Sequence, residues 1–249
     1  MPATLFLSFA HPDDESFLAG GTICRYADEG VRVVLACATL GESGKAGTPP
    51  ICRPEELPAV RERELREACG LLGVNALHLL GYRDRELASA PLEEIRGHLV
   101  RLIRGTRPLV VLTFDPHGAN LHPDHIAISR FTADAVSAAA DPRWFPEAGP
   151  AHVVPRLAWV PGRHPWEWTR DADPGLRPGV DFAIDVHRWR DRKVAALQAH
   201  RTQLHSLQRN FFGQPDAERL LGAEYFRQGW GPALDQRPLD DLFAGLGPA

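Results

Sequence analysis

Short apolar segments alternate with longer amphipathic ones through the first half of the chain, and this alternation constrains the fold more than any other feature. The apolar segments predict strands at 4–10, 31–39, 77–80 and 109–114. The amphipathic segments have the spacing of helices at 12–29, 54–72, 92–104 and 123–139. Strands separated by helices favour a mostly parallel sheet with helices on both faces. We therefore expect a doubly wound α/β fold.

The second half of the chain is less regular. Segments 157–160 and 180–184 predict two further strands, and 187–209 predicts one long helix. Loops are expected where glycine, proline and polar residues gather, at 40–53, 81–89, 142–150 and 164–178. From residue 213 onward the composition predicts no particular element. Because no repeat or linker interrupts the chain, we expect one domain over 1–249, with a less regular part from about 141.

Charge and cysteine content argue against several classes of protein. The net charge of −4 gives no reason to expect nucleic acid or an anionic membrane as a partner. No segment reaches the ~20 apolar residues that span a bilayer. The N-terminal apolar stretch also lacks the basic start of a signal peptide. The four cysteines lie far apart without a C-x-x-C pair, so reduced thiols and a cytoplasmic location are expected. The oligomeric state is left open.

The polar segment 11–15, which reads His-Pro-Asp-Asp-Glu, follows the first predicted strand directly. An imidazole and three carboxylates at the end of a buried strand are costly to bury without partners. A divalent cation would satisfy several of them at once. The segment therefore raises the question of a metal site.

A second segment, 122–125, reads His-Pro-Asp-His and also lies between a strand and a helix. Residues three apart share one helix face, so His11 can converge with Asp14, and His122 with His125. Ligands of open α/β sheets bind beyond the carboxyl ends of the strands, where the two segments would meet if their strands are neighbours. Two histidines, one carboxylate and an open position make the ligand set of a catalytic zinc site. We predict His11, Asp14 and His125 as the ligands.

The remaining side chains of the two segments have the chemistry that a hydrolytic reaction needs. Asp13 is expected to act as the general base that takes a proton from the metal-activated water. His122 would stabilise an oxyanion or protonate a leaving amine. Asp124 would hold one imidazole in the required tautomer. The same ligand set also suits Fe²⁺ or Co²⁺.

These segments resemble the two signature motifs of the LmbE-like (PIG-L) N-deacetylases. Further matches lie at 39–44 (Thr-Leu-Gly-Glu-Ser-Gly), 61–65 (Arg-Glu-Arg-Glu-Leu), 80–84 (Leu-Gly-Tyr-Arg-Asp) and 199–203 (Ala-His-Arg-Thr-Gln). The resemblance spans about residues 4–205 and implies a Rossmann-like fold and a bound Zn²⁺. It also implies removal of acetyl from N-acetylglucosamine-type substrates by the residues named above. Residues that would line the sugar pocket are Glu42, Arg61, Asp84 and His200.

Other interpretations stay open for several residues. Some similar members that act on glucosaminyl-inositol precursors have tyrosine two positions before the second-motif histidine, where this chain has Asn120. This difference weighs against a tyrosine contact to the oxyanion and against that substrate. A glucosaminyl-malate, an antibiotic sugar or a chitobiose unit remains open. His117 is interpreted as a loop residue, and Glu15 has no assigned role. The alternatives for the pocket residues are a buried core histidine (His200), a solvated carboxylate (Glu42), an intrahelical ion pair (Arg61) and a turn cap (Asp84).

The leading hypothesis is therefore a zinc-dependent N-deacetylase acting on a glucosamine-containing small molecule. An amidase of the same family, cleaving the amide of a thiol S-conjugate, is the second hypothesis. A non-catalytic metal-binding or sugar-binding module is the third, from another class. A nucleotide-binding protein is disfavoured, because the glycines at 20–21 lie within a predicted helix and lack the spacing of a dinucleotide fingerprint. Those glycines are expected to let the helix approach the sheet or the metal loop.

Overall fold

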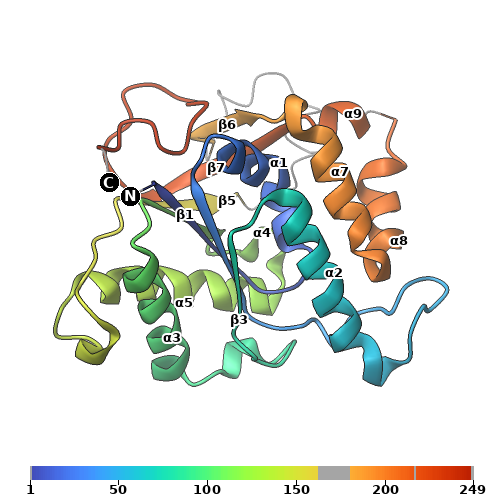
Figure 1. The fold of residues 1–249 in the computed structure, drawn as a ribbon, viewed down its shortest axis with the longest axis horizontal. Coiled ribbons are helices and arrows are strands. Elements are labelled where there is room, and N and C mark those ends of the chain that lie inside the picture. Colours follow the sequence, from blue (N-terminus) through green and yellow to red (C-terminus); the bar gives the residue numbers. More distant parts are fainter. Residues whose placement is uncertain (1, 162–179, 216, 248–249) are drawn as a thin grey trace.

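A computed structural model describes residues 2–161, 180–215 and 217–247. Its centre is a seven-stranded sheet in the order β3-β2-β1-β4-β5-β7-β6 (Figure 1). The strands are β1 (Thr4–Phe9), β2 (Arg32–Cys37), β3 (Ala76–Leu79), β4 (Val110–Phe114), β5 (Arg156–Val160), β6 (Phe182–Asp185) and β7 (Ala223–Trp230). The first five of the order are parallel neighbours, and β7 is antiparallel to both β5 and β6.

The central strands are the most apolar and the most deeply buried. Every residue of β1 and of β4 is buried, as expected for a parallel sheet covered on both faces. All six strands predicted from apolar segments are present, with ends within a few residues of the predicted ones. The prediction of a mostly parallel α/β sheet is confirmed.

Helices cover both faces of the sheet (Figure 1). Helices α1 (Asp14–Asp28), α2 (Leu57–Leu72) and α7 (Arg190–Ala199) pack together on one face. Helices α3 (Leu92–Thr106) and α5 (Pro123–Ala140) pack together on the other. Shorter helices are α4 (Gly118–Leu121), α8 (Leu204–Leu207) and α9 (Ala217–Leu220). Single turns of 3-10 helix lie at Pro54–Glu56, Leu87–Ser89, Pro146–Ala148, His187–Trp189 and Arg201–Gln203, and a π-helical turn at Gln208–Phe212.

The prediction of one helix over 187–209 is wrong. Helix α7 ends at Ala199, and His200 leaves the helical conformation with φ −79° and ψ 65°. The break is set by tertiary contacts, since the His200 ring bonds to Glu15 and the backbone N–H of Thr202 donates to Glu64. Helical periodicity in the sequence does not register such contacts.

The strand β7 lies in the segment where no element was predicted. It inserts between β5 and β6 and continues the sheet that begins with the N-terminal strands. The loop expected at 164–178 lies outside the described residues. The single domain over 1–249 stays a prediction.

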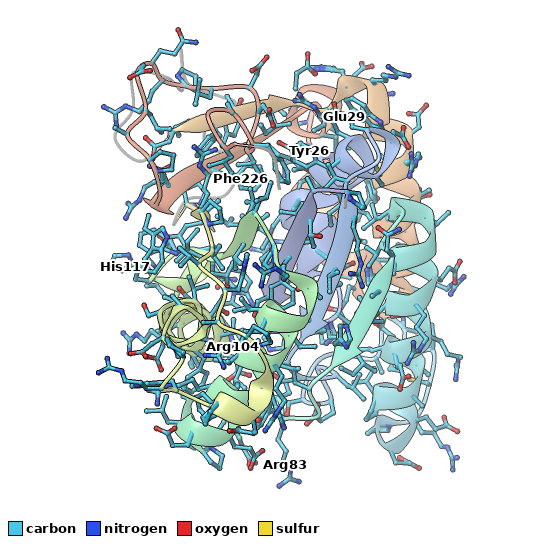
Figure 2. All side chains as sticks on the ribbon, turned by 60° about the vertical axis from the view of Figure 1, so that its left-hand side comes forward. Tyr26, Glu29, Arg83, Arg104, His117 and Phe226 are labelled. Atoms are coloured by element: carbon cyan, nitrogen blue, oxygen red, sulfur yellow. The ribbon has the colours of Figure 1, made fainter. Side chains whose placement is uncertain are left out.

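Gly21 lets α1 approach the sheet, as the sequence predicts. A Cβ atom at this position would lie 2.4 Å from the Cβ of Val186, the residue that follows β6. On the opposite face, the guanidinium of Arg104 donates to backbone carbonyls at the end of α5, including those of Ala138 and Ala139 (Figure 2). The first contact sets how closely α1 lies to the sheet, and the second joins α3 to α5.

All four cysteines are free thiols. Among the described residues, every helix is too short or too polar to cross a membrane. The cytoplasmic location stays a prediction.

Candidate metal centre and active site

The two histidine motifs meet at the carboxyl ends of the neighbouring strands β1 and β4. The Nδ1 atom of His11 lies 3.1 Å from the Nε2 atom of His125. Asp14 completes the group, with Oδ1 3.4 Å from His125 Nε2 and Oδ2 3.8 Å from His11 Nδ1. All three side chains are nearly buried. The three residues predicted as ligands therefore present their donor atoms to one point.

Backbone contacts fix the direction of these donor atoms. The Oδ2 atom of Asp14 accepts the backbone N–H groups of Ala10 and His11, at 3.1 and 2.8 Å. The Nδ1 atom of His125 lies 3.1 Å from the carbonyl oxygen of Gly118, so the N–H of that atom donates and Nε2 is left as an acceptor. The ring of His125 also stacks on Phe114, with centroids 4.0 Å apart.

The other nitrogen of His11 faces two carboxylates. Its Nε2 atom lies 3.1 Å from Asp84 Oδ1 and 3.3 Å from Asp124 Oδ2, so it carries a proton. Burial disfavours a charged His11 ring, but the hydrogen bonds to Asp124 and Asp84 outweigh it and raise the pKa of His11 to about 10. Burial and the neighbouring His11 lower the pKa of His125 to about 3. Two ring nitrogens as close as His11 Nδ1 and His125 Nε2 face each other with lone pairs unless positive charge lies between them.

A cation fits the point where these donors meet. The contact between His11 Nδ1 and His125 Nε2 therefore needs a positive charge between the two nitrogens. A metal ion beside Asp14 supplies that charge as well as a proton does. Two further groups of donors could also hold a cation: His11 with His122 and His125, and His11 with Asp84 and Asp124. The carboxylates of the latter group are already engaged, because Asp84 Oδ2 accepts the N–H of Ser43 and Asp124 Oδ2 accepts the N–H of Arg85. Carboxylates on the far nitrogen of a histidine usually orient a metal ligand.

His122 is positioned beside this centre as a neutral donor. Its Nδ1 atom accepts the backbone N–H of Asp124 at 3.2 Å, which leaves the proton on Nε2. Burial, together with the charge of His11, lowers the pKa of His122. Its ring centroid lies 4.8 Å from those of both His11 and His125. The ring borders the cavity, so a donor N–H is available there.

Asp13 has an unusual backbone. With φ 117° and ψ −28° it is left-handed, a conformation that costs a non-glycine residue on the order of 1–3 kcal/mol. Burial raises the pKa of its carboxyl group to about 6, and the Arg61 guanidinium opposes this shift. One Arg61 nitrogen lies 3.3 Å from Asp13 Oδ2, and the guanidinium also donates to the carbonyls of Gly41 and Pro12.

A cavity of about 390 Å³ opens over these residues. Arg61 and Asp84, two of the four predicted pocket residues, line it together with the predicted metal and acid–base residues. Glu42 and His200 are not among its lining residues in the described structure, and their contact with a substrate stays a prediction. The Glu42 carboxylate instead accepts the N–H of Asp84 at 2.9 Å. His200 is fully buried beneath α1.

Several lining residues were not predicted as pocket residues, although Ser43, Gly44 and Gln203 lie within matched motifs and Asn120 was considered for its position. They are Phe17, Leu18, Ser43, Gly44, Arg85, Phe114, Ala119, Asn120, Gln203, Ser206 and Phe211. Phe17 and Leu18 follow Asp14 by one helical turn, and Arg85 follows Asp84, so proximity to the motifs could have indicated these three. The side chain of His117 is 78% exposed and lies at the periphery of the molecule, in agreement with a loop residue (Figure 2).

Comparisons with known proteins agree with this geometry. The family model described as "PIG-L: GlcNAc-PI de-N-acetylase" matches residues 6–136. The chain is 36% identical to a 1D-myo-inositol 2-acetamido-2-deoxy-alpha-D-glucopyranoside deacetylase of Acidothermus cellulolyticus, over 99% of this chain and 96% of that protein. It is 34% identical to a protein of the same name in Geodermatophilus obscurus, over 97% of each.

Solved structures share the fold. The conserved protein TT1542 of Thermus thermophilus is 28% identical, with a TM-score of 0.69 over 94% of this chain and 97% of that one. GalB, a 4-carboxy-2-hydroxymuconate hydratase of Pseudomonas putida, shows the fold alone, at 19% identity and a TM-score of 0.67 over 94% and 99%. The family match and the full-length relatives, found for a chain with both histidine motifs in place, show that this protein belongs to the PIG-L family.

Proposed function

We propose that this protein is a metal-dependent hydrolase that removes the N-acetyl group from a glucosamine-containing small molecule. The relatives that span the whole chain are named as deacetylases of an acetylated glucosaminyl-inositol. One structural observation supports the proposal more than any other. His11, Asp14 and His125 converge at the floor of a cavity that Asp13 and His122 also line.

Three residues would hold the metal: His11 through Nδ1, Asp14 through its carboxylate and His125 through Nε2. Two histidines and one carboxylate are typical of catalytic zinc, so we propose Zn²⁺, with Fe²⁺ or Co²⁺ as alternatives. Such a cation, when bound, polarises an amide carbonyl and makes water acidic enough to attack at neutral pH. In this arrangement Asp84 and Asp124 hold the His11 ring in place through its Nε2 proton.

Asp13 would carry out the proton transfers, and His122 would stabilise the negative charge that develops. The Asp13 carboxylate takes a proton from the attacking water, and Arg61 holds that carboxylate through its Oδ2 atom. The Nε2–H of His122 donates to the oxygen that becomes negative as the tetrahedral intermediate forms. The proton held by Asp13 then passes to the leaving nitrogen, and acetate is released.

The relatives support an inositol aglycone. Both of the full-length relatives described above carry the same name, although this chain has Asn120 where some similar members have tyrosine. The acetylated glucosaminyl-inositol is therefore the first substrate to test. The loops that line the cavity contribute Ser43, Gly44, Asp84 and Arg85, which would contact the sugar or its aglycone.

The test measures acetate release by the zinc-loaded protein from 1D-myo-inositol 2-acetamido-2-deoxy-α-D-glucopyranoside. We expect turnover by the wild type and a loss of about 10²–10⁴-fold in Asp13→Ala, which should keep its metal. Asp235→Ala, which removes an exposed carboxylate that is not among the described lining residues, is the control. Release of an amino-acid conjugate from a thiol S-conjugate, but no acetate, would favour the amidase. Full metal content without hydrolysis of any acetylated glucosaminide would favour a non-catalytic module.

A further inference from the structure

We infer that Glu15 and His200 form a buried pair that positions Asp13 for catalysis. The inference rests on the proposed function, because it concerns how the proposed base is held. Neither residue is among those that line the cavity in the described structure. Their effect on the reaction must therefore pass through another residue. The contacts below identify that residue as Asp13.

The strained backbone of Asp13 needs an external constraint. Its φ of 117° is unfavourable for any residue with a Cβ atom, and it persists only where the surroundings determine it. The backbone N–H of Asp13 donates to Glu15 Oε2 at 3.1 Å. This bond fixes the peptide on the N-terminal side of Asp13, which sets the direction in which the side chain leaves the backbone. A residue with the same side chain but a relaxed backbone would point its carboxylate elsewhere.

Glu15 is itself held by two donors. Its Oε1 atom accepts a hydrogen bond from the hydroxyl group of Ser16 at 2.5 Å and one from the His200 Nε2–H at 2.8 Å. Glu15 is 1% exposed and His200 is 0% exposed. A carboxylate buried so deeply is stable only when its oxygens are paired. His200 therefore fixes the orientation of the carboxylate that constrains Asp13.

Helix α2 supports Asp13 in two ways, through a residue that contacts its carboxylate and through a residue that stabilises the turn next to His200. Arg61 contacts the Asp13 carboxylate directly. One turn along the same helix, Glu64 accepts the backbone N–H of Thr202 at 3.0 Å and its hydroxyl group at 2.7 Å. These bonds stabilise the turn at which the chain leaves α7, and this turn directs the His200 ring towards Glu15. Asp13 is thus held at its carboxylate from one side and at its backbone from the other.

A purely structural role is the alternative, and the chain offers a matched control for it. Glu224 is also a fully buried carboxylate that accepts backbone N–H groups of α1, from Gly21 at 2.9 Å and Thr22 at 2.8 Å. It is paired with a buried cation, Lys193, at 2.6 Å. It is not among the described residues that line the cavity. Loss of Glu224 should destabilise the protein without changing the chemistry.

The experiment compares kcat, KM, metal content and thermal stability of zinc-loaded variants at a temperature where each is folded. Glu15→Ala and Glu15→Asp should lower kcat by about 10- to 100-fold, because neither side chain reaches both partners and small misplacements of a reacting group are costly. Metal content should equal that of the wild type, and KM should change by less than about 3-fold, because Glu15 is not among the described residues that line the cavity. Glu15→Gln keeps an acceptor for the Asp13 N–H, with its NH₂ group facing Nε2 of a His200 ring that is protonated at Nδ1, and should retain more kcat than Glu15→Asp.

The variants of the partner and the control decide the outcome. His200→Gln, which keeps a donor close to the Nε2 position, should be more active than His200→Ala by about 10-fold. Glu224→Ala should lower the melting temperature while the folded protein keeps the kcat of the wild type. The inference is wrong if Glu15→Asp is as active as the wild type, or if Glu224→Ala loses as much kcat as Glu15→Ala. An inactive wild type would instead contradict the proposed function. If Glu15→Ala does not fold, the Glu15→Asp and Glu15→Gln pair still gives the answer.

Discussion

The Nδ1 atom of His11 and the Nε2 atom of His125 lie 3.1 Å apart, in a contact that is stable only when positive charge lies beside it. The remaining nitrogens of both rings already serve as donors, to Asp84 and Asp124 from His11 and to the Gly118 carbonyl from His125. The Asp14 carboxylate faces the same point. A proton meets the requirement in the metal-free protein, and a divalent cation would replace it.

The contact between His11 and His125 predicts that removal of His125 and removal of His122 have different effects on metal binding. We expect His125→Ala to lose the metal, because the variant removes one of the three converging donors. His122→Ala should keep it, since the Nδ1 atom of His122 accepts the Asp124 N–H. Elemental analysis of the two proteins, purified side by side with one equivalent of zinc and then dialysed, measures the difference. A full zinc equivalent on His125→Ala would contradict this ligand assignment, as would its loss from His122→Ala.

Arg61 is expected to contribute to stability as well as to catalysis. Arg61→Met leaves the Gly41 and Pro12 carbonyls without their donor and should cost about 2–4 kcal/mol of unfolding free energy. Urea denaturation measures this change. The control is Arg66→Met on the same helix, whose exposed ion pair with Glu62 should contribute less than about 0.5 kcal/mol. Equal effects of the two variants would show that the buried contacts of Arg61 are not important for stability.

Two glycines in helices should respond to alanine in opposite directions. Gly21→Ala places a Cβ atom 2.4 Å from that of Val186 and should destabilise the fold by about 1–3 kcal/mol. Gly70→Ala in α2 meets no heavy atom of the described residues within 4 Å and should stabilise it by about 0.5–1 kcal/mol. Thermal unfolding of both variants checks the signs. A stabilised Gly21→Ala would mean that α1 can move away from Val186 at little cost.

His152 should make the fold sensitive to acid. Burial lowers the pKa of His152, whose Nε2–H donates to the Pro108 carbonyl at 2.8 Å. Above about pH 6.5 the ring is neutral in both states. As the pH falls below that value, the unfolded chain takes up a proton first, so the free energy of unfolding decreases until the pH reaches the lowered pKa of the folded state. The decrease from about pH 7 to about pH 5 should be smaller in His152→Gln, which can still donate to Pro108. Parallel slopes in urea titrations of the two proteins would contradict the prediction.

The strands and both motifs could be predicted because they depend on local sequence. An apolar run such as that of β4 is buried in a doubly wound sheet, and a histidine motif between a strand and the next helix lies at the carboxyl edge. The break at His200 and the strand β7 could not be predicted this way. The first depends on Glu15 and Glu64, far away in the sequence, and the second on pairing with β5 and β6.

The functions of Glu42 and Asp84 show a similar limit. Their contact with substrate stays a prediction, and the structure adds contacts that the sequence did not predict: the Glu42 carboxylate accepts the Asp84 N–H and the Asp84 carboxylate accepts the Ser43 N–H. Asp84 also contacts His11. A motif match indicates that residues lie near a site, whereas their contacts depend on loop conformations that the sequence pattern does not specify.

The pairing of β1 with β4 has a consequence for how this centre tolerates change. His11 and His125 are 114 positions apart in the sequence, yet both are tied to the ends of neighbouring strands. His11 follows β1 closely, and the ring of His125 stacks on Phe114, the last residue of β4, and bonds to the Gly118 carbonyl. Insertions or deletions between β1 and β4 should therefore alter the cavity rim while leaving the span between the histidines unchanged.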